Sequence, residues 1–485
     1  MNLKPVLHVV AWLLGIVALL MGLCGLVSVL HGEPVVAWTA LVKSAAGTLA
    51  VAVVLWLATR NDHELSRRDG LGVVALGWMA AGIAGAVPFV LSGVIPSPVA
   101  AVFETISGMT TTGASVIPVP EEVSKGILLW RATTHLIGGM GVLVLVVAIL
   151  PIAGAGGMQL FRAEMAGPSK DRIEPRVAST AKMLWGVYII LTVVLIFLLH
   201  WGGMDWFDSV CHSFATLATG GFSTRTVSIA AYDSAFIEVV LTVFMLIGGI
   251  NFALHYRMLR GEVLAWWKDA EVRFFLGAFV ASTVAGAVVL HHARAAAGMA
   301  WSGAFREVSF TCASLMTTTG FSTGDFDRWP VVLKPMLILL MLLGGCAGST
   351  AGAIKAGRIQ VMLKAVIREI RLFMQPQAVI PIKIGRKFLD DDLLRSILSF
   401  VLLYLLVLLA GIIAMIPFAP DLATAASAAV ACLGNVGPGF SKVGPLLNYA
   451  AIPDAGKAIL TLLMLVGRLE LYTVLALFMP AFWRK

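Results

Sequence analysis

Residues Phe310–Gly324 read FTCASLMTTTGFSTG: an apolar run ends in Thr317-Thr318-Thr319-Gly320, and a second long apolar run follows. Related stretches occur three more times, as SGMTTTGA at 107–114, TLATGGF at 216–222 and, in a more divergent form, LGNVGP at 433–438. Their anchor glycines, Gly113, Gly221, Gly320 and Gly437, return about every hundred residues, which indicates an internal repeat. The sequence therefore predicts four copies of one structural unit.

The composition is that of a polytopic membrane protein. Hydrophobic residues make up 59% of the chain and charged residues 13%, whereas soluble domains are about 45–50% apolar and about 25% charged. The net charge of +8 does not indicate nucleic-acid binding, because the basic residues lie at helix ends and in the connections between helices. The five cysteines lie in apolar stretches without metal-ligand spacing, so we expect free thiols.

Ten stretches have the length of about 20 apolar residues that a membrane span needs. They are, approximately, 5–31, 35–59, 71–93, 131–153, 181–201, 236–256, 274–293, 331–353, 395–417 and 458–481. Four further apolar segments, about 98–110, 206–218, 303–317 and 422–433, each precede an anchor glycine. At 1.5 Å per residue each reaches roughly 20 Å, too short to cross a bilayer. Their predicted N-caps are Ser97, Asp205, Ser302 and Asp421.

The spans that follow the anchors also resemble one another, with Gly138-Gly139, Gly248-Gly249, Gly344-Gly345 and Gly467-Arg468 at matching positions. We therefore predict an all-α polytopic membrane protein with four pseudo-symmetric helix–pore-helix–helix repeats around a central pore, plus two N-terminal transmembrane helices. The predicted division is 1–68 for the two extra helices, 69–168 for repeat 1, 169–262 for repeat 2, 263–388 for repeat 3 with its cytoplasmic connection, and 389–485 for repeat 4.

Basic residues predict which side of the membrane is cytoplasmic. They cluster at Arg60/Arg67/Arg68, Arg162–Lys182, Arg257–Arg273, Lys355–Arg395 and Arg484/Lys485, all on one side of a ten-span topology. The C-terminus is thus expected in the cytoplasm, and the short helices are expected to enter from outside.

Non-helical backbone at membrane depth is tolerated only where protein covers it or it lines a watery path. Four such strands around one axis would form a ring of carbonyl oxygens, which is how cation selectivity filters replace a hydration shell. Glycine permits the required backbone conformations, and the preceding threonines are stiff at χ1, which suits an extended strand. The predicted filter residues are Thr110, Thr111, Thr112, Gly113, Thr219, Gly220, Gly221, Thr318, Thr319, Gly320, Asn435, Val436 and Gly437. The alternative is four coincidental glycine kinks in packed helices.

A second candidate element is the run Gly344–Gly352, GGCAGSTAG, in the third repeat. Its predicted gating residues are Gly344, Gly345, Gly348, Ser349, Thr350 and Gly352, which would break the helix beneath the filter. The alternative is a glycine-rich face for close helix packing.

Arg468 stands where the other repeats carry Gly139, Gly249 and Gly345, so it is predicted to face the pore and act with the gate. At roughly 6 Å and an effective dielectric of about 20, it would repel a cation by about 2.8 kcal/mol. The alternative is a buried ion pair with Glu470 or another repeat's carboxylate.

Other polar residues carry weaker signals. Glu104, on the first short helix, is expected to make a structural hydrogen bond behind the filter. His291-His292 and Glu121-Glu122 are expected at solvated surface rather than in a metal site, and Asp390–Asp392 is expected to begin a helix.

The pattern resembles the Trk-type potassium uptake superfamily, in particular its bacterial TrkH/TrkG branch, over the whole chain. The residues that carry the resemblance are Thr110–Gly113, Thr219–Gly221, Thr317–Gly320, Asn435–Gly437, Gly344–Gly352 and Gly467-Arg468-Leu469-Glu470. The resemblance implies a potassium conduit, a homodimer and a cytosolic nucleotide-binding regulatory subunit, TrkA. Potassium would contact Thr111, Thr112, Thr219, Gly220, Thr318, Thr319, Asn435 and Val436. The fourth repeat departs from a symmetric filter, with Asn435-Val436 in place of Thr-Thr.

These observations predict potassium uptake across the bacterial inner membrane, with no enzymatic activity and no organic cofactor. The alternatives are a sodium-passing or poorly selective channel of the same fold, a proton-coupled potassium symporter, and an intramembrane enzyme, for which no nucleophile–base pattern is visible. Segment 355–390 is the candidate surface for the regulatory subunit, and contact with anionic membrane lipid is the alternative.

Overall fold

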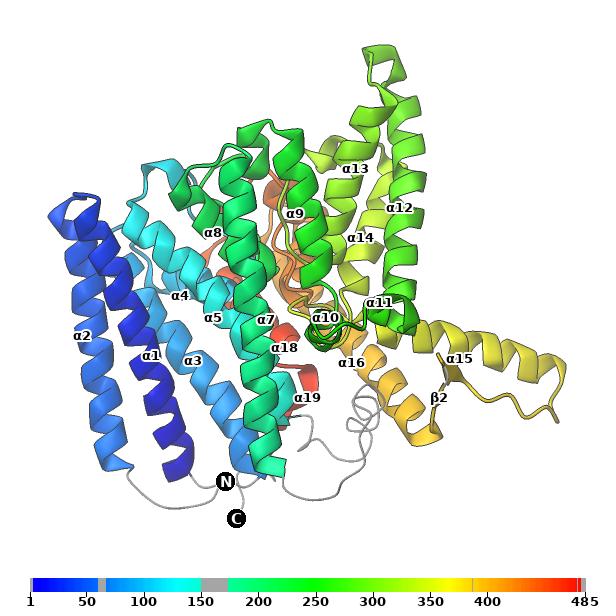
Figure 1. Ribbon diagram of the computed structural model, residues 1–485, viewed down its shortest axis with the longest axis horizontal. Helices are drawn as coiled ribbons and strands as arrows, with labels where there is room; N and C mark the ends of the chain where they lie inside the picture. Colours follow the sequence, from blue (N-terminus) through cyan, green and yellow to red (C-terminus); the bar gives the residue numbers. More distant parts are fainter. Residues whose placement is uncertain (1–2, 60–66, 150–172, 386, 478, 481–485) are drawn as a thin grey trace.

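The computed structural model describes residues 3–59, 67–149, 173–385, 387–477 and 479–480. Within these residues six helices are long and apolar enough to span a membrane, or seven if one bent pair counts as a single span. The only strands in the described part are β1 (Lys383–Ile384) and β2 (Lys387–Phe388), an antiparallel pair. The predicted all-α polytopic membrane fold is confirmed (Figure 1).

Seven of the ten predicted spans are continuous helices in the described residues. They are α1 (Leu3–Leu30), α2 (Val35–Ala58), α3 (Arg67–Leu91), α5 (Lys125–Ile149), α7 (Ile173–Trp201), α12 (Ala270–Arg294) and α16 (Asp391–Met415). Asp390 is the N-cap residue of α16, as expected. The predicted span residues 150–153 and 481, most of the basic segment 162–182, and residues 484–485 lie outside the described residues.

The other three predicted spans are broken helices. They are α9 (Ala235–Gly248) with α10 (Phe252–Leu259), α14 (Lys334–Leu343) followed by the glycine-rich loop, and α18 (Asp454–Arg468) with α19 (Leu471–Leu477). The α9–α10 pair is bent by 103°. Asn251 caps α10 by accepting a hydrogen bond from Ala253 N (2.8 Å), and the Gly249 carbonyl accepts one from Cys346 N (2.8 Å). Backbone groups freed by this break therefore find partners inside the protein, as a membrane interior demands.

Four short helices match the predicted half-helices. They are α4 (Pro98–Met109), α8 (Trp206–Leu217), α13 (Trp301–Met316) and α17 (Leu422–Leu433). Ser97, Asp205 and Asp421 cap α4, α8 and α17 by accepting hydrogen bonds from Ala100 N, Asp208 N and Thr424 N. The 12 residues of α4 extend about 18 Å, well short of a span.

The predicted N-cap of α13 is wrong. Ser302 lies inside the first turn, and the N-cap residue is Ala300, which makes no side-chain cap bond. The start of α13 is instead fixed by packing, because the Trp301 ring stacks on His291 of α12 at a centroid distance of 3.9 Å. This contact partly buries His291, whereas His292 is exposed, as expected for it.

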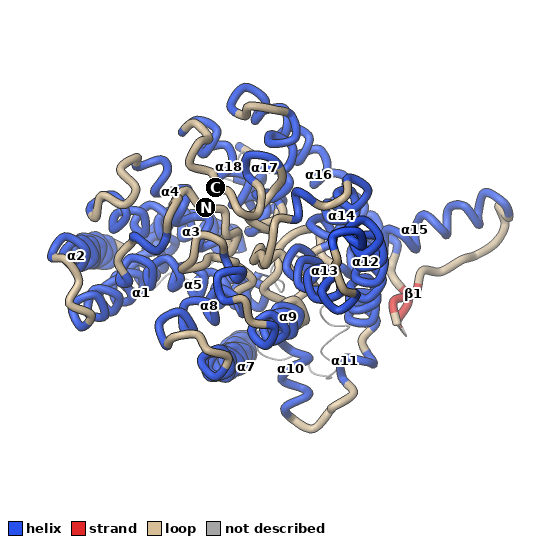
Figure 2. Tube along the Cα trace, turned by 90° about the horizontal axis from the view of Figure 1, so that it is seen from above, coloured by secondary structure: helices blue, strands red, loops and turns tan. Residues whose placement is uncertain are grey.

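The remaining elements connect and flank the spans. The helices are α11 (Ala265–Lys268) and α15 (Ala356–Met374), and the 3₁₀ turns are η1 (Pro120–Glu122), η2 (Ser228–Tyr232), η3 (Ala295–Ala297), η4 (Phe326–Arg328), η5 (Val331–Leu333), η6 (Ile416–Phe418) and η7 (Ser441–Val443). Figure 2 shows the helices around a centre filled by loops, with α15 projecting from the body. All five cysteines are buried and outside disulfide bonds, as predicted.

The N-caps predict a measurable loss of stability. Asp205→Ala removes the acceptor that Asp208 N uses (2.6 Å) and should destabilise the protein by about 1 kcal/mol. Asp205→Asn keeps a side-chain oxygen and should stay close to the wild type. Denaturant unfolding in detergent micelles measures both variants, and equal losses in the two would contradict the capping role.

Candidate functional site

The four short helices end in the same way. The residue two before each anchor glycine has a left-handed backbone: Thr111 (φ 52), Thr219 (φ 54), Thr318 (φ 59) and Asn435 (φ 54). The following amide bonds back to the carbonyl five residues earlier, in the pairs Thr112–Ser107, Gly220–Ala215, Thr319–Ser314 and Val436–Ala431, at 2.7–2.8 Å. This is the Schellman arrangement that terminates helices, here with threonine or asparagine where glycine is usual.

The expectation of extended backbone at the threonines is therefore wrong for Thr111, Thr219 and Thr318, whereas Thr112 and Thr319, directly before their anchors, do not have a positive φ. A β-branched residue in the left-handed region costs of order 1–3 kcal/mol and persists only where its surroundings hold it. At Thr318 the surroundings include Gly352, whose amide donates to Thr318 Oγ1 (2.7 Å). At the fourth repeat the residue is Asn435, a type that tolerates this conformation better. Its Nδ2 donates to Thr112 Oγ1 and to the Met464 carbonyl, both at 3.0 Å.

The four anchor glycines form a closed ring. A Cβ on Gly113 would lie less than 3.0 Å from the Gly220 carbonyl oxygen, and the same holds in order for the other three. The pairs are Gly113 with Gly220 O, Gly221 with Thr319 O, Gly320 with Val436 O, and Gly437 with Thr112 O. Each glycine also has a positive φ, between 77° and 99°. Only glycine satisfies both constraints, and the order of contacts brings all four repeats around one axis.

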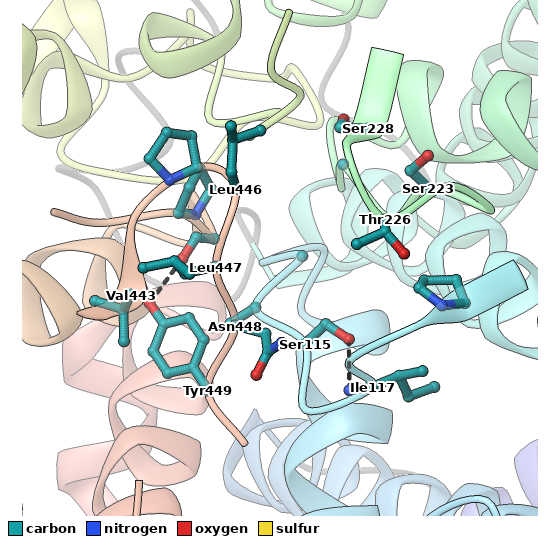
Figure 3. A pocket seen from close by; sticks show the side chains of 18 of the residues that line it. Ser115, Ile117, Ser223, Thr226, Ser228, Val443, Leu446, Leu447, Asn448 and Tyr449 are labelled. Atoms are coloured by element: carbon teal, nitrogen blue, oxygen red, sulfur yellow. Dashed lines mark hydrogen bonds between the residues drawn. The ribbon is translucent and has the colours of Figure 1, made fainter. Parts of the chain in front are cut away.

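One side of this ring opens into a cavity of about 90 Å³ (Figure 3). Its lining includes all four anchor glycines together with residues of the connecting segments that follow them, such as Ser115, Thr226 and Tyr449. Glu121, an expected surface residue, accepts hydrogen bonds from Thr226 N (2.7 Å) and Thr226 Oγ1 at this rim. Although desolvation acts to raise it, these bonds and the charge of Arg225 hold the pKa of Glu121 below its usual value. A carboxylate thus stays ionised beside the cavity.

Buried polar side chains hold the strands from behind. Glu104 accepts hydrogen bonds from Val116 N (2.7 Å), Ser115 Oγ (2.9 Å) and Arg131 Nε (2.7 Å), which confirms the structural role expected for it. In the second repeat, His212 bridges the Asp208 carbonyl and Ser223 Oγ. These contacts fix strand positions without placing the charged groups in the ring.

His135 is a supporting residue that the sequence did not reveal. Phe222 N donates to its Nε2 (3.1 Å), so its Nδ1 carries the proton and donates to the Gly108 carbonyl (2.8 Å). The side chain thereby joins the end of α4 to the strand of the next repeat. A signal was present: in the register of the repeated glycines, the matching residues are Met245, Met341 and Met464.

The loop after α14 lies against the opposite side of the strands. Thr350 Oγ1 has the carbonyls of Leu217 (2.9 Å) and Gly248 (3.1 Å) within hydrogen-bond distance and can donate its proton to either, and Gly352 N donates to Thr318 Oγ1. Gly344 (φ 71) and Gly348 (φ 76) are left-handed, and a Cβ at Gly345 or Gly352 would clash with neighbouring backbone. Ser349 Oγ bonds within the loop, to the Cys346 carbonyl (2.6 Å), and does not reach the strands. A helix-packing face is excluded here, because these residues are not helical.

Arg468 contacts this loop directly. Its side chain is buried, at 5% exposure, and Nη1 donates to the Thr350 carbonyl (2.6 Å), while Nε and Nη2 have no partner. The alternative of a Glu470–Arg468 ion pair is wrong, because Glu470 pairs with Arg358 at 2.9 Å. The amide oxygen of Asn435 is likewise buried without a partner. Three of the buried polar atoms without a partner among the described residues, Asn435 Oδ1 and Arg468 Nε and Nη2, thus belong to residues at the strands and the loop, where water could satisfy them.

Sequence comparison places the chain among transport proteins. The model of the TrkH family, described as a cation transport protein, matches residues 39–485. The chain belongs to the TrkH family. It is 42% identical to the Trk system potassium uptake protein TrkH of Escherichia coli K12 over 446 residues, 90% of each chain. It is 39% identical to the protein of the same name from Salmonella typhimurium over 494 residues, 100% of each.

A solved structure has the same fold. The crystal structure of the potassium transporter TrkH from Vibrio parahaemolyticus superposes with a TM-score of 0.91 at 35% identity, over 100% of both chains. The family consists of multi-pass membrane transport proteins rather than enzymes, in agreement with the sequence expectation.

The ring predicts a strong effect of one methyl group. Gly221→Ala forces a Cβ against the Thr319 carbonyl at a left-handed residue and should reduce cation flux about tenfold or more. Gly186→Ala is the matched control, because Gly186 lies on α7 with nothing within 4 Å of its added Cβ. Flux through purified protein in liposomes distinguishes them. Wild-type flux in Gly221→Ala would contradict the ring.

Proposed function

We propose that the chain mediates potassium uptake across the bacterial inner membrane through a filter of backbone carbonyls from four repeats. The supporting observation is the closed order of contacts, in which each anchor glycine lies against the carbonyl oxygen of the next repeat. Four oxygens of like partial charge converge on one axis, an arrangement that a dehydrated cation stabilises. The potassium contacts would be the carbonyl-bearing pairs that precede the anchors: Thr111-Thr112, Thr219-Gly220, Thr318-Thr319 and Asn435-Val436.

The short helices strengthen this preference for a cation. Each of α4, α8, α13 and α17 ends two residues before the left-handed residue of its strand, so the partly negative C-terminal ends of all four converge at the ring. Described carboxylates near the strands, such as Glu104, are engaged in ion pairs and hydrogen bonds behind them. Selectivity is therefore assigned to the backbone, and no catalytic group or organic cofactor is needed.

The loop from Gly344 to Gly352 is proposed as the gate, together with Arg468. In the present conformation the loop makes hydrogen bonds to Thr318, Leu217 and Arg468, which belong to three different repeats. The Arg468 guanidinium would add a positive charge to the proposed ion path. Passage of an ion would therefore require that the loop release some of these bonds and that the charge of Arg468 be offset or moved.

The proposal extends to assembly, as the resemblance to the Trk family implies. The protein would act as a homodimer with a TrkA-like, nucleotide-binding regulatory subunit at the cytoplasmic face. Helix α15 supports a partner surface in segment 355–390, because it projects from the body and exposes Val366, Ile370 and Phe373, the last at 89%. Contact with anionic lipid through its basic residues remains the competing role.

Ion competition tests the substrate. In liposomes with a membrane potential that is negative inside, ⁸⁶Rb⁺ uptake should be inhibited strongly by K⁺ and weakly by Na⁺ or Li⁺. The reason is that all four repeats carry glycine at the anchor position of the ring. Stronger inhibition by Na⁺ would assign sodium to the filter, and uptake that follows an imposed proton gradient at zero potential would assign proton symport. Liposomes with Gly221→Ala protein provide the background.

Removing the pore charge tests the gate. Arg468→Ala eliminates both the bond to the Thr350 carbonyl and a repulsion of about 2.8 kcal/mol at roughly 6 Å, so flux should rise by about ten- to a hundredfold. Arg468→Lys keeps the charge and should give a smaller rise. Single-channel or stopped-flow flux measurements decide, and an unchanged rate in Arg468→Ala would refute the barrier role.

A further inference from the structure

Glu271 is a buried carboxylate that none of the preceding assignments explains. It lies in the first turn of α12 and is 8% exposed. Its Oε1 accepts two backbone hydrogen bonds, from Ala347 N (2.9 Å) and from Gly357 N (2.8 Å). The two donors lie on either side of the segment 348–356, so one oxygen atom joins the middle of the loop Gly344–Gly352 to the first turn of α15.

The surrounding residues are fitted to this contact. A Cβ on Gly357 would lie 2.8 Å from Glu271 Oε1, closer than real Cβ atoms come, so the glycine lets the carboxylate approach the amide without shifting. Lys355, between the two donors, turns its ammonium back to the Ala351 carbonyl. The loop is therefore closed on itself at its base, and Glu271 is the side chain outside the loop that bonds both Ala347 and Gly357.

Glu271 also lies where the cytoplasmic connections meet. Asp269, the N-cap residue of α12, follows α11 directly, and α15 begins at Ala356, one residue before the second donor. Gln360 of α15 donates to the Ala270 carbonyl at the start of α12 (3.4 Å). Figure 1 shows the start of α12, α11 and the start of α15 close together at the same level of the molecule. A displacement of either α12 or α15 would pull one donor away from the carboxylate.

We infer that Glu271 is a positioning residue for the gate: its carboxylate holds the loop closed, and separating it from Ala347 or Gly357 releases the loop. The contact with Glu271 affects the closed state and the displaced state of the loop differently. In the closed loop both amides are buried and depend on this acceptor, whereas in a displaced loop they can bond to water in the conduit. The contact therefore stabilises only the closed arrangement. This inference rests on the gate proposed above.

The test is a gain of flux in the absence of any regulatory subunit. Glu271→Ala leaves both amides unsatisfied only in the closed state, so ⁸⁶Rb⁺ flux in proteoliposomes containing the full chain alone should rise about ten- to a hundredfold. Glu271→Gln keeps a neutral acceptor oxygen for both amides and should show a rise of about tenfold at most. Glu262→Ala is the matched control, because Glu262 is a solvent-exposed carboxylate between α10 and α11 to which no role in the gate is assigned. Misfolding lowers flux, so a merely structural role cannot produce the expected increase.

A second readout follows the loop itself. Cys346 precedes Ala347 and is buried, so its labelling by a water-soluble methanethiosulfonate reagent, read by mass spectrometry of its peptide, reports displacement of the loop. Labelling of Cys346 should be faster in Glu271→Ala than in the wild type, and faster to a smaller extent in Glu271→Gln. The glutamine variant supplies the measurement if the alanine variant does not fold. Wild-type flux and wild-type labelling in folded variants would overturn the inference. Faster labelling without faster flux would support the role of Glu271 in holding the loop and would reject this loop as the gate.

Discussion

The structure depends on a steric constraint that closes on itself: the carbonyl oxygen of one strand lies where the next strand's glycine has no side chain. Because the contacts run from the first repeat to the second, third, fourth and back to the first, no strand can move without displacing its neighbour. The constraint also explains the helix ends. To present its carbonyl at that position, each chain leaves its short helix through a left-handed residue, and the strain is accepted because the neighbouring strands and the loop hold it in place.

The supports behind the ring differ from repeat to repeat, although the ring itself is nearly symmetric. Glu104 with Arg131 serves the first strand and His212 with Ser223 the second, while Ser314 and Ser427 bond the carbonyls of Phe321 and Phe440 in the third and fourth. The constraint acts on the backbone, so any side chain that satisfies the local polar groups suffices. The same reasoning accounts for the divergent fourth copy. Asn435 occupies the left-handed position more easily than threonine does, and its amide makes two of the bonds that hold the strand.

The sequence predicted the elements whose signal is local. Capped apolar segments of half a span, followed by glycine at a constant interval, indicated the short helices and their convergence. Features set by tertiary contacts were not predictable from these patterns. The β-branched side chains of Thr111, Thr219 and Thr318 argued for extended backbone, and the Schellman bonds of their helices overrode that preference. The breaks after Gly248 and Arg468 look like continuous apolar spans in sequence. At the first break, the groups that satisfy the freed backbone come from the distant segment 346–350, and after the second, Glu470 pairs with Arg358 of α15. The pore position of Arg468 stays a prediction, and its observed partner, a backbone carbonyl, carries no sequence signature.

The position of Arg468 is explained by the same electrostatics that favour a cation in the ring. A guanidinium buried at membrane depth with one hydrogen bond costs several kcal/mol in isolation. Here it is bonded to the loop, and the four short helices end at a ring of carbonyl oxygens, so that backbone groups supply negative potential. In the proposed mechanism, the positive charge of Arg468 and a bound cation would be stabilised by the same field and would compete for it. Movement of the loop, to which Arg468 is bonded, would then be the step that changes the balance between them.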